Sequence, residues 1–472
     1  MTTSASVRPT VASDPVADGA AQAVALVAER LADPETVAAV ASRDDNRDPV
    51  YGTLMWAPLT LSNGLPGVAT FYAELARLDP GRWPSAQDAA HRHLRAAASM
   101  TTGSGRGLHA GPAAALAAAQ SCAGSAGHYR TLRRRLADWL VADQLAKLDL
   151  WRARREQGKV GASWAGYDVI NGLAGTGRLL LDAVRDPEEG GPAADRALTG
   201  TLAHLTALAE PIDVDGHRVP GWWVPPDGQP SARDATEYPH GDFNLGMAHG
   251  VPGPLWLLCE ATARGHEVPG QRAAIAAMAE WLIGWTLVDE VGDYWPCRVS
   301  WAEQLDSDRP ASAFTRTAWC YGAPGVAAAL YRAGDVCAEP AWCRAAVAGL
   351  RAGLRRDEPR WALDGPTVCH GYAGLLLALH RVGTAAADQE LLAGARRVAA
   401  RVLDHTDPDA PFGFRHLMRF PRGHAGPTHR ALDLAGLLEG AAGVACALLP
   451  LLACGPGVSA SGPAWHRCLG MS

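Results

Sequence analysis

The chain has 472 residues, of which 48% are apolar and 19% are charged, and a chain of this length can bury one or more large apolar cores. Its formal net charge is −6, from 43 Lys and Arg against 49 Asp and Glu, which excludes a broad basic surface for nucleic acid. The ten cysteines form no tight framework and no signal peptide is visible, so we expect reduced thiols in a cytoplasmic protein.

The two ends of the chain differ in composition from the rest. Residues 1–20 are rich in Thr, Ser, Val and Ala, and we expect a flexible N-terminal segment there. We assign residues 21–456 to a single domain and residues 457–472 to a C-terminal tail. The longest apolar stretch, residues 440–454, contains Pro450 and is shorter than the roughly 20 residues that a membrane span needs. We therefore expect a buried helix there and no membrane span.

A short phrase recurs along the chain: two glycines three residues apart, followed by a small or apolar helix-forming run. It occurs seven times, at intervals of roughly 50 to 80 residues, which suit a helical hairpin with or without an insertion. The second glycine is replaced by Ala in one copy. The copies are Gly64-Leu-Pro-Gly67, Gly111-Pro-Ala-Ala114, Gly172-Leu-Ala-Gly175, Gly250-Val-Pro-Gly253, Gly322-Ala-Pro-Gly325, Gly371-Tyr-Ala-Gly374 and Gly440-Ala-Ala-Gly443.

Each copy has the chemistry of a helix start. Pro66, Pro252 and Pro324 occupy first-turn positions, where the missing N–H would be unpaired anyway. The runs that follow are apolar on nearly all sides and alternate with more polar helices. We predict an all-α fold, an α/α toroid of seven inner and seven outer helices, because no copy resembles a polar capping repeat; an open solenoid is the alternative. The insertions at about residues 210–242 and 287–315 should form rim loops.

Equivalent positions in a closed ring converge at one end, so the residues before each first glycine are informative. Cys320 and Cys369 each lie two positions before the first glycine of their repeat, and His370 follows Cys369 directly. Two thiolates and an imidazole suit Zn²⁺ and leave a fourth position open. Two thiolates also neutralise the ion, which favours activation of a substrate thiol over hydrolysis. Two small core cysteines and a satisfied buried histidine are the alternative, and the shared register favours the metal.

The chain resembles the lanthipeptide cyclases, the lanthionine synthetase C-like family, over about residues 63–449. The phrases that carry the resemblance are Tyr167-Asp-Val-Ile-Asn-Gly-Leu-Ala-Gly175, Asn244-Leu-Gly-Met-Ala-His-Gly250, Arg316-Thr-Ala-Trp-Cys-Tyr-Gly322 and Cys369-His-Gly371. The resemblance implies an α/α toroid with one catalytic zinc held by Cys320, Cys369 and His370. It implies that a precursor-peptide cysteine adds to dehydroalanine or dehydrobutyrine and forms a lanthionine or methyllanthionine thioether. A separate dehydratase must then prepare this peptide, and an exporter is a further partner.

The same phrases supply candidates for the proton transfer. His249 is the first choice to protonate the enolate, with a turn-capping histidine as the alternative. Asp168 could orient His249 or a water, or cap a helix. Arg316 could steady the enolate oxygen or form a structural salt bridge. Tyr321 could donate a hydrogen bond in the site or simply pack.

Two other functions remain open at this stage. One is a non-catalytic zinc-dependent protein that binds the thiol of glutathione or of a partner's cysteine. The other is a toroidal glycan hydrolase, which would need paired acids at the pore, where Asp168 and Glu439 are the candidates. The remaining features have simpler interpretations. We expect the Arg130 to Arg135 cluster to be a solvated helix face, with leader-peptide binding as the lesser alternative. The other cysteines are expected to be small core residues or to lack a ligand pattern. These cysteines are Cys122, Cys259, Cys297, Cys337, Cys343, Cys446, Cys454 and Cys468.

Overall fold

The computed structural model describes residues 14–124, 127–186, 189–306, 316–420, 426–452 and 464–471. Four sequence predictions fall partly or wholly outside these ranges. They concern residues 1–13 of the N-terminal segment, residues 307–315 of the second insertion, Cys454, and residues 457–463 of the tail.

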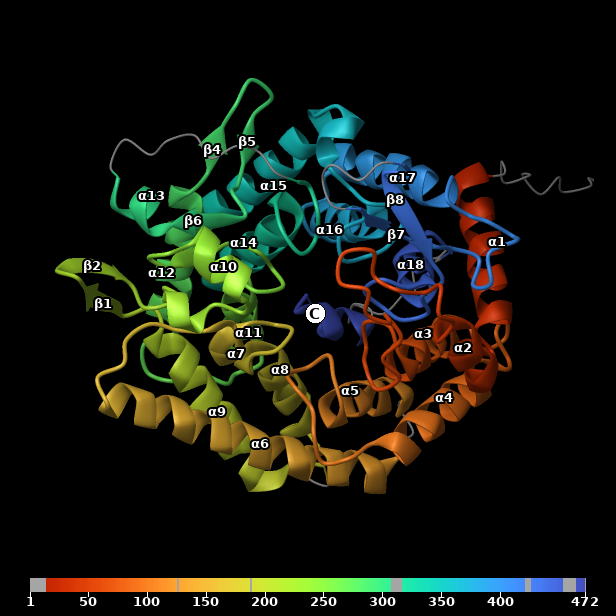
Figure 1. Ribbon diagram of the computed structural model, residues 1–472, viewed down its shortest axis with the longest axis horizontal. Helices are drawn as coiled ribbons and strands as arrows, with labels where there is room; N and C mark the ends of the chain where they lie inside the picture. Colours follow the sequence, from red (N-terminus) through yellow and green to blue (C-terminus); the bar gives the residue numbers. More distant parts are fainter. Residues whose placement is uncertain are drawn as a thin grey trace, which may run out of the picture.

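Helices in two concentric layers form a closed ring, which confirms the α/α toroid (Figure 1). In the described ranges the inner layer has seven helices, each starting at one copy of the glycine repeat: α3 (Leu65–Leu78), α5 (Pro112–Cys122), α8 (Leu173–Ala183), α11 (Pro252–Ala263), α14 (Ala323–Cys337), α16 (Tyr372–Ala385) and α18 (Ala441–Leu448). The last inner helix, α18, packs against the first, α3. The ring is therefore closed without capping repeats.

The outer layer of the described chain also has seven helices. Six of them follow their inner partners in sequence: α4 (Ala86–Met100), α6 (Arg130–Glu156), α9 (Gly191–Ala207), α12 (Gln271–Gly284), α15 (Pro340–Arg355) and α17 (Gln389–Leu403). The seventh, α1 (Pro15–Arg30), comes from the N-terminus and packs against α17 and α18. Asp14 caps it by accepting the N–H groups of Val16 and Ala17. Residues 15–20, which we expected in a flexible segment, are thus helical.

The second glycine of a repeat lets the loop before each inner helix fold back onto its first turn. A Cβ atom on Gly175 would overlap the carbonyl oxygen of Val169, and one on Gly443 would overlap that of Leu437. In both copies the carbonyl belongs to the residue six positions earlier. The glycine spacing therefore reflects close backbone packing at the helix start.

A belt of backbone hydrogen bonds joins neighbouring repeats in one register. Ala248 N–H donates to Cys320 O at 3.5 Å, and Cys320 N–H donates to Cys369 O at 3.1 Å. Cys369 N–H donates to Leu438 O at 2.9 Å, and Leu438 N–H donates to Ser62 O at 3.2 Å. Each of these residues lies two positions before the first glycine of its repeat. The belt therefore places the two cysteines of adjacent repeats side by side.

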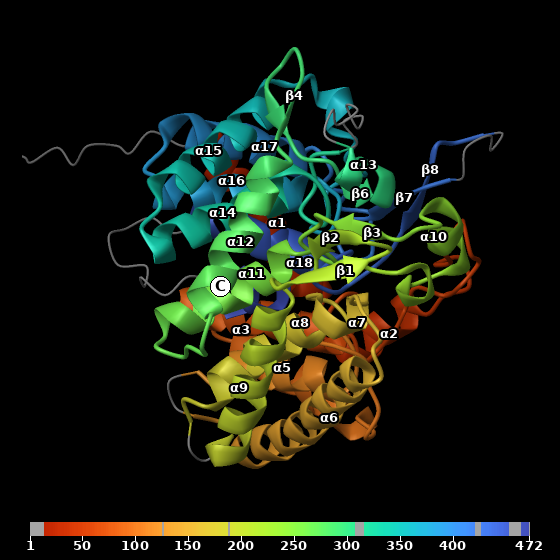
Figure 2. The ribbon, with the colours of Figure 1, turned by 90° about the vertical axis from the view of Figure 1, so that its left-hand side faces the viewer.

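Short strands and helices lie in the insertions and in other connections between the helices of the ring. Strands pair antiparallel as β1 (Pro211–Val214) with β2 (His217–Pro220), β3 (Asp242–Asn244) with β6 (Arg298–Ser300), β4 (Leu287–Val288) with β5 (Asp293–Tyr294), and β7 (His416–Arg419) with β8 (His429–Leu432). The short helices are α2 (Pro34–Ala41), α7 (Trp164–Tyr167), α10 (Ala232–Glu237), α13 (Trp301–Leu305), η1 (Pro226–Gly228), η2 (Glu358–Trp361) and η3 (Leu449–Leu452). Figure 2 shows β3, β6, β7 and β8 on one side of the ring.

One detail of the outer layer differs from expectation. Arg133 does not lie on a solvated face: it is buried, and its guanidinium binds Glu189 Oε2 at 2.6 Å and Asp186 Oδ2 at 2.5 Å. A buried arginine needs such partners to offset the cost of desolvation. Within the described ranges no helix is both long and apolar enough to cross a lipid bilayer.

The C-terminal segment fills the centre of the ring. Helix η4 (Ala464–Leu469) packs against α3, α5 and α8, and the chain end lies at the middle of the toroid in Figure 1 and away from the β7–β8 hairpin in Figure 2. The ring of His109 hydrogen-bonds Cys468 O through Nε2 at 2.8 Å. Trp465 is fully buried, and its backbone N–H donates to Glu74 Oε1. Residues 464–471, which we placed in a tail, are therefore part of the core.

Replacing Trp465 with Ala should lower the free energy of unfolding by about 3 kcal/mol or more, as is typical when a buried aromatic side chain leaves a cavity. Urea unfolding followed by circular dichroism measures the change. Leu150→Ala is the control, because Leu150 is 59% exposed and such a surface change should cost less than about 0.5 kcal/mol. Equal stabilities of the Trp465→Ala and parent proteins would contradict the packing of this segment.

Candidate metal centre

The three residues predicted to bind metal come together at the N-terminal ends of two adjacent inner helices. Cys320 lies just before α14, and Cys369 and His370 lie just before α16. The two sulfur atoms and one ring nitrogen of His370 all lie within 4.8 Å of one another. Three donors so close can coordinate one ion, and thiolate with imidazole is the donor set that Zn²⁺ prefers.

The two thiols are electrostatically distinct. A hydrogen bond from the Cys369 thiol holds the pKa of Cys320 well below its usual range, with His370 and Arg316 acting in the same direction. The same hydrogen bond, together with burial, raises the pKa of Cys369 well above its usual range. Burial alone would lower the pKa of His370, but its hydrogen bond with Cys320 raises it. The two thiols therefore differ in how readily they lose their protons, and the thiolate is the form that binds a cation.

A histidine and a carboxylate form a second group beside these donors. His249 Nδ1 and Asp168 Oδ2 are 2.6 Å apart. The other carboxylate oxygen of Asp168 accepts the N–H groups of Asn171 and Gly172, at 2.6 and 2.7 Å, at the start of α8. Trp164, in α7, stacks on the His249 ring with centroids 4.2 Å apart. The ring is therefore fixed, with Nδ1 directed to the carboxylate and Nε2 left for another partner.

Burial and hydrogen bonding act in opposite directions on Asp168. Its side chain is fully buried. Burial raises its pKa, and the hydrogen bonds from His249, Asn171 and Gly172 limit the rise. The pair lies next to the donor cluster, because the backbone N–H of Ala248, adjacent to His249, donates to Cys320 O. A carboxylate and histidine in this arrangement can orient the imidazole for proton transfer.

Arg316 and Tyr321 flank Cys320 with different partners. Arg316 faces a buried carboxylate, since its Nη2 lies 3.9 Å from Asp364 Oδ2. The hydroxyl of Tyr321 accepts a hydrogen bond from Asn244 Nδ2 at 3.1 Å, and burial raises its pKa. Asn244 is held in turn by strand β3, where it pairs with Arg298. The guanidinium of Arg316 can stabilise negative charge near the metal donors. The hydroxyl of Tyr321 is instead hydrogen-bonded to Asn244 of strand β3.

The two carboxylates proposed for a glycan hydrolase are held by different partners. Asp168 binds His249, as described above. Glu439 Oε2 accepts a hydrogen bond from Asn63 Nδ2 at 2.8 Å. Each of these two acids therefore has its own hydrogen-bond partner.

The sequence analysis missed two residues that complete the site. Trp164 could have been found from its position four residues before Asp168, one helical turn away. Asp364 accepts hydrogen bonds from Arg419 Nη2 at 2.8 Å and from His429 Nε2 at 3.0 Å, and its N–H donates to His370 O. It lies outside every glycine repeat, and its partners come from the β7–β8 hairpin, so no sequence signal marked it.

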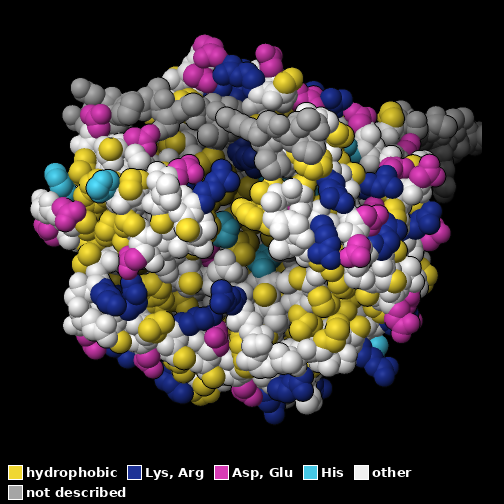
Figure 3. Space-filling view, viewed as in Figure 1, with side chains coloured by type: hydrophobic (Ala, Val, Ile, Leu, Met, Phe, Trp, Pro, Cys, Tyr) yellow, Lys and Arg dark blue, Asp and Glu magenta, His cyan; other side chains and the backbone are white. Residues whose placement is uncertain are grey.

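Part of the site is exposed to solvent: Cys369, His370 and His249 are half-buried, whereas Cys320 and Asp168 are buried. Figure 3 shows a depression at the centre of one face of the ring, with histidine side chains at its bottom and arginine or lysine side chains around it. The inner helices converge below it in the same view of Figure 1. An extended molecule could reach the donors from this face.

Known proteins are similar to this chain in sequence and in fold. The sequence model of the family described as "Lanthionine synthetase C-like protein" matches residues 55–456. The nisin biosynthesis protein NisC of Lactococcus lactis subsp. lactis is 25% identical over 162 residues, which is 34% of this chain and 36% of NisC. The match therefore spans about a third of that relative. The solved structure of a nisin cyclase superposes with a TM-score of 0.69 at 19% identity and covers 97% of this chain and 98% of the cyclase.

Proposed function

Because the chain belongs to the lanthionine synthetase C-like family, we propose that it is a zinc-dependent lanthipeptide cyclase. The substrate would be a precursor peptide in which a dehydratase has converted Ser or Thr to dehydroalanine or dehydrobutyrine. The observation that carries the proposal is the cluster of Cys320, Cys369 and His370 beside the hydrogen-bonded pair of His249 and Asp168. The first group suits thiol activation, and the second suits proton transfer.

The donor set fits a zinc ion. Cys320, Cys369 and His370 would hold it, and three protein ligands leave one tetrahedral position for a substrate sulfur. The ion would lower the pKa of that thiol and keep it nucleophilic. Arg316 lies four residues before Cys320, and its Nη2 is 3.9 Å from Asp364 Oδ2.

The proposed reaction is an addition that forms one C–S bond and breaks one C=C π bond. The substrate sulfur attacks the β-carbon of the dehydro residue, and the electron pair moves onto the adjacent carbonyl as an enolate. His249 takes up the proton of the substrate thiol at Nε2 and donates it to the α-carbon while Asp168 holds the ring through Nδ1, so the S–H bond that breaks is balanced by the C–H bond that forms. Arg316 stabilises the negative charge on the enolate oxygen. The product is a lanthionine or methyllanthionine ring.

The proposal implies partners and a compartment. A separate dehydratase must supply the dehydrated peptide, and an exporter would remove the product. The reaction needs a reduced thiol, so we place the protein in the cytoplasm, where thiols stay reduced. The described cysteines are all free, in keeping with that assignment.

The test is to count free thiols, because cyclisation leaves the mass of the peptide unchanged. Purified protein, analysed for about one bound zinc per chain, is incubated with synthetic peptides that contain one dehydroalanine and one cysteine at varied spacing. We expect alkylation by N-ethylmaleimide to be lost with time, faster than in samples without protein. Retention of every thiol together with peptide binding would instead favour the non-catalytic thiol-binding function.

A further inference from the structure

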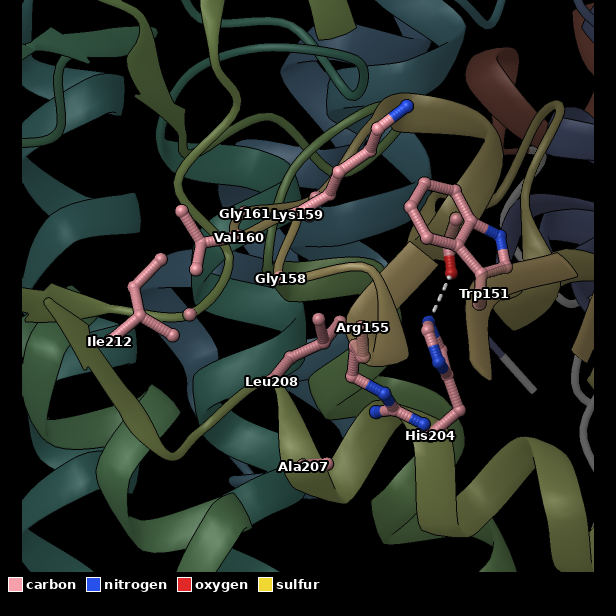
Figure 4. Close-up of a pocket in the computed structure, with 13 residues that line it drawn as sticks. Trp151, Arg155, Gly158, Lys159, Val160, Gly161, His204, Ala207, Leu208 and Ile212 are labelled. Atoms are coloured by element: carbon pink, nitrogen blue, oxygen red, sulfur yellow. Dashed lines mark hydrogen bonds between the residues drawn. The ribbon is translucent and has the colours of Figure 1, made fainter. Parts of the chain in front are cut away.

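The residues of the proposed mechanism are held from two sides of the ring. On one side, helix α7 forms part of a pocket between α6 and α9: its Gly166 accepts a hydrogen bond from His204 at 3.1 Å (Figure 4), and its Trp164 stacks on His249. On the other side, the β7–β8 hairpin contacts the loop that carries Cys369. Figure 1 places α7 and this hairpin on opposite sides of the ring centre.

The hairpin is fixed to the loop of residues 362–371 by packing and hydrogen bonds. Gly365 has a φ of +77°, and a Cβ atom there would lie 2.9 Å from Leu417 Cγ, so strand β7 packs directly on this backbone. Thr367 Oγ1 and His416 Nδ1 are 3.1 Å apart. The ring of His416 also meets the ring of His370 edge to face, with centroids 5.3 Å apart. The loop and the hairpin therefore form one unit next to the metal donors.

Asp364 divides its two carboxylate oxygens between the hairpin and Arg316. Oδ1 accepts hydrogen bonds from Arg419 Nη2 at 2.8 Å and from His429 Nε2 at 3.0 Å. Oδ2 lies 3.9 Å from Arg316 Nη2. The backbone N–H of Asp364 donates to His370 O at 3.0 Å, which fixes this residue relative to the donors. Asp364 thus connects the hairpin, a residue of the donor cluster and Arg316.

The carboxylate of Asp364 is charged and shielded from water. Its side chain is 6% exposed. Burial alone would raise its pKa, but the hydrogen bonds from Arg419 and His429 lower it below its usual value, so the group is ionised at neutral pH. Within the described ranges no other carboxylate lies in salt-bridge contact with Arg316. Because water screens a buried anion less than an exposed one, Asp364 is the group that attracts the Arg316 guanidinium.

The distance between the two groups leaves Arg316 able to act on a substrate. A separation of 3.9 Å exceeds the roughly 3.2 Å of a hydrogen bond, so Asp364 attracts the guanidinium without occupying its N–H groups. The positive charge of Arg316 also acts on the thiols of Cys320 and Cys369 and favours their thiolate forms. Without the carboxylate of Asp364, these sulfur atoms would be left to attract the guanidinium.

We propose that Asp364 is a positioning residue that directs Arg316 to the enolate oxygen and keeps its guanidinium from pairing with the sulfur atoms of the metal site. The inference rests on the proposed function, in which Arg316 stabilises the enolate. The β7–β8 hairpin contributes through Arg419 and His429, which hold the carboxylate in place. The effect is expected in the transition state, where the enolate charge develops, and not in the binding of the peptide.

The first test is the kinetics of Asp364→Asn in the assay of thiol loss. Asparagine has nearly the same shape, and its oxygen can still accept hydrogen bonds from Arg419 and His429, but it has no charge to attract Arg316. We expect kcat to fall at least about tenfold, because misplacing a group by about 1 Å can lower a rate about 10²-fold. KM should change less than about twofold, and zinc should be retained.

A double-mutant cycle separates positioning from a structural role. In Arg316→Ala protein, the further change Asp364→Asn should cause no additional loss of kcat, because the group that Asp364 positions is absent. A residue that only stabilises the loop would lower kcat by the same factor with or without Arg316. That second result would overturn the proposal.

The next test does not depend on turnover. Crystal structures of the zinc-loaded parent and Asp364→Asn proteins show where the Arg316 guanidinium lies. We expect it to turn from residue 364 toward Cys320 Sγ or Cys369 Sγ in the variant. A guanidinium that stays beside residue 364, or that turns into solvent, would contradict the proposal. A parent protein that consumes no thiol, but whose variant shows the expected movement, contradicts the proposed function alone.

Asp433→Asn is the matched control for both measurements. Asp433 is also buried, follows strand β8 directly, and binds two arginines, Arg43 and Arg415, the latter at 3.2 Å. Its contacts among the described residues do not include Arg316. This variant should leave kcat, KM and the position of Arg316 unchanged. An equal fall of kcat in both variants, or a loss of zinc or of helical circular dichroism in Asp364→Asn, would make Asp364 a structural residue and overturn the proposal.

Discussion

Replacing Cys320 with Ala is expected to remove the bound zinc and to lower the rate of thiol consumption by more than about a hundredfold, a loss that even an outer partner of a metal ligand can cause. Cys369→Ala should behave alike, because the two sulfur atoms and His370 lie within 4.8 Å of one another. With one thiolate missing, two protein donors remain, too few for the three-ligand site of a zinc enzyme. Metal analysis measures the loss of zinc, and the N-ethylmaleimide assay measures the loss of rate.

Cys446→Ala is the control for these variants. Cys446 is fully buried on inner helix α18, and burial raises the pKa of its thiol well above the usual range, so it is a small core residue and no ligand. This variant should keep its zinc and its activity. Circular dichroism checks that all three variants fold. Full zinc content in both Cys320→Ala and Cys369→Ala would show that the metal is bound elsewhere.

The fold could be predicted from the sequence because the repeated glycines mark places where two backbone segments pack closely. Gly175 and Gly443 must lack a Cβ atom for the preceding loop to contact the helix start, and such a requirement is visible as a recurrent glycine. Closure of the ring followed from the absence of polar capping repeats. The seventh outer helix was not recognised as such, because α1 begins at Pro15 and pairs with α18 from the far end of the chain. Only the tertiary contact identifies that partner.

The donor cluster was predictable for the same reason. Cys320 and Cys369 occupy the same position in adjacent repeats. The hydrogen bond from Cys320 N–H to Cys369 O holds these two positions side by side. Asp364 could not be predicted, since its partners Arg419 and His429 come from a hairpin outside the repeats. The burial of residues 464–471 in the ring was also missed, because a short C-terminal segment carries no periodicity from which to infer a location.

In the proposed mechanism, the His249–Asp168 pair acts in proton transfer and does not bind the metal. Neither residue belongs to the donor cluster, yet Ala248 N–H reaches Cys320 O across the belt. Changes at this pair should therefore alter the rate and leave the zinc content unchanged. This differs from the cysteine variants, in which the rate and the metal are lost together.

His249→Ala should lower the rate by about 10² to 10⁴-fold, the usual contribution of a general acid or base, with zinc retained. Asp168→Asn should cause a loss of the same kind for a different reason. The asparagine oxygen can still accept the N–H groups of Asn171 and Gly172, but its NH₂ group would face His249 Nδ1. The neutral imidazole would then carry its proton on Nε2 and accept at Nδ1, so Nε2 could no longer take up the thiol proton that it must later donate to the α-carbon.

Metal analysis and initial rates of thiol loss measure the effect of each variant. Added imidazole distinguishes removal of the ring from a change in its tautomer. It should partly restore His249→Ala, in which the ring is absent and leaves a space next to Trp164. It should have no effect on Asp168→Asn, in which the ring remains in place. Loss of zinc from His249→Ala would instead make His249 a ligand and overturn the assignment of His370. Unchanged rates in both variants would show that another group protonates the enolate.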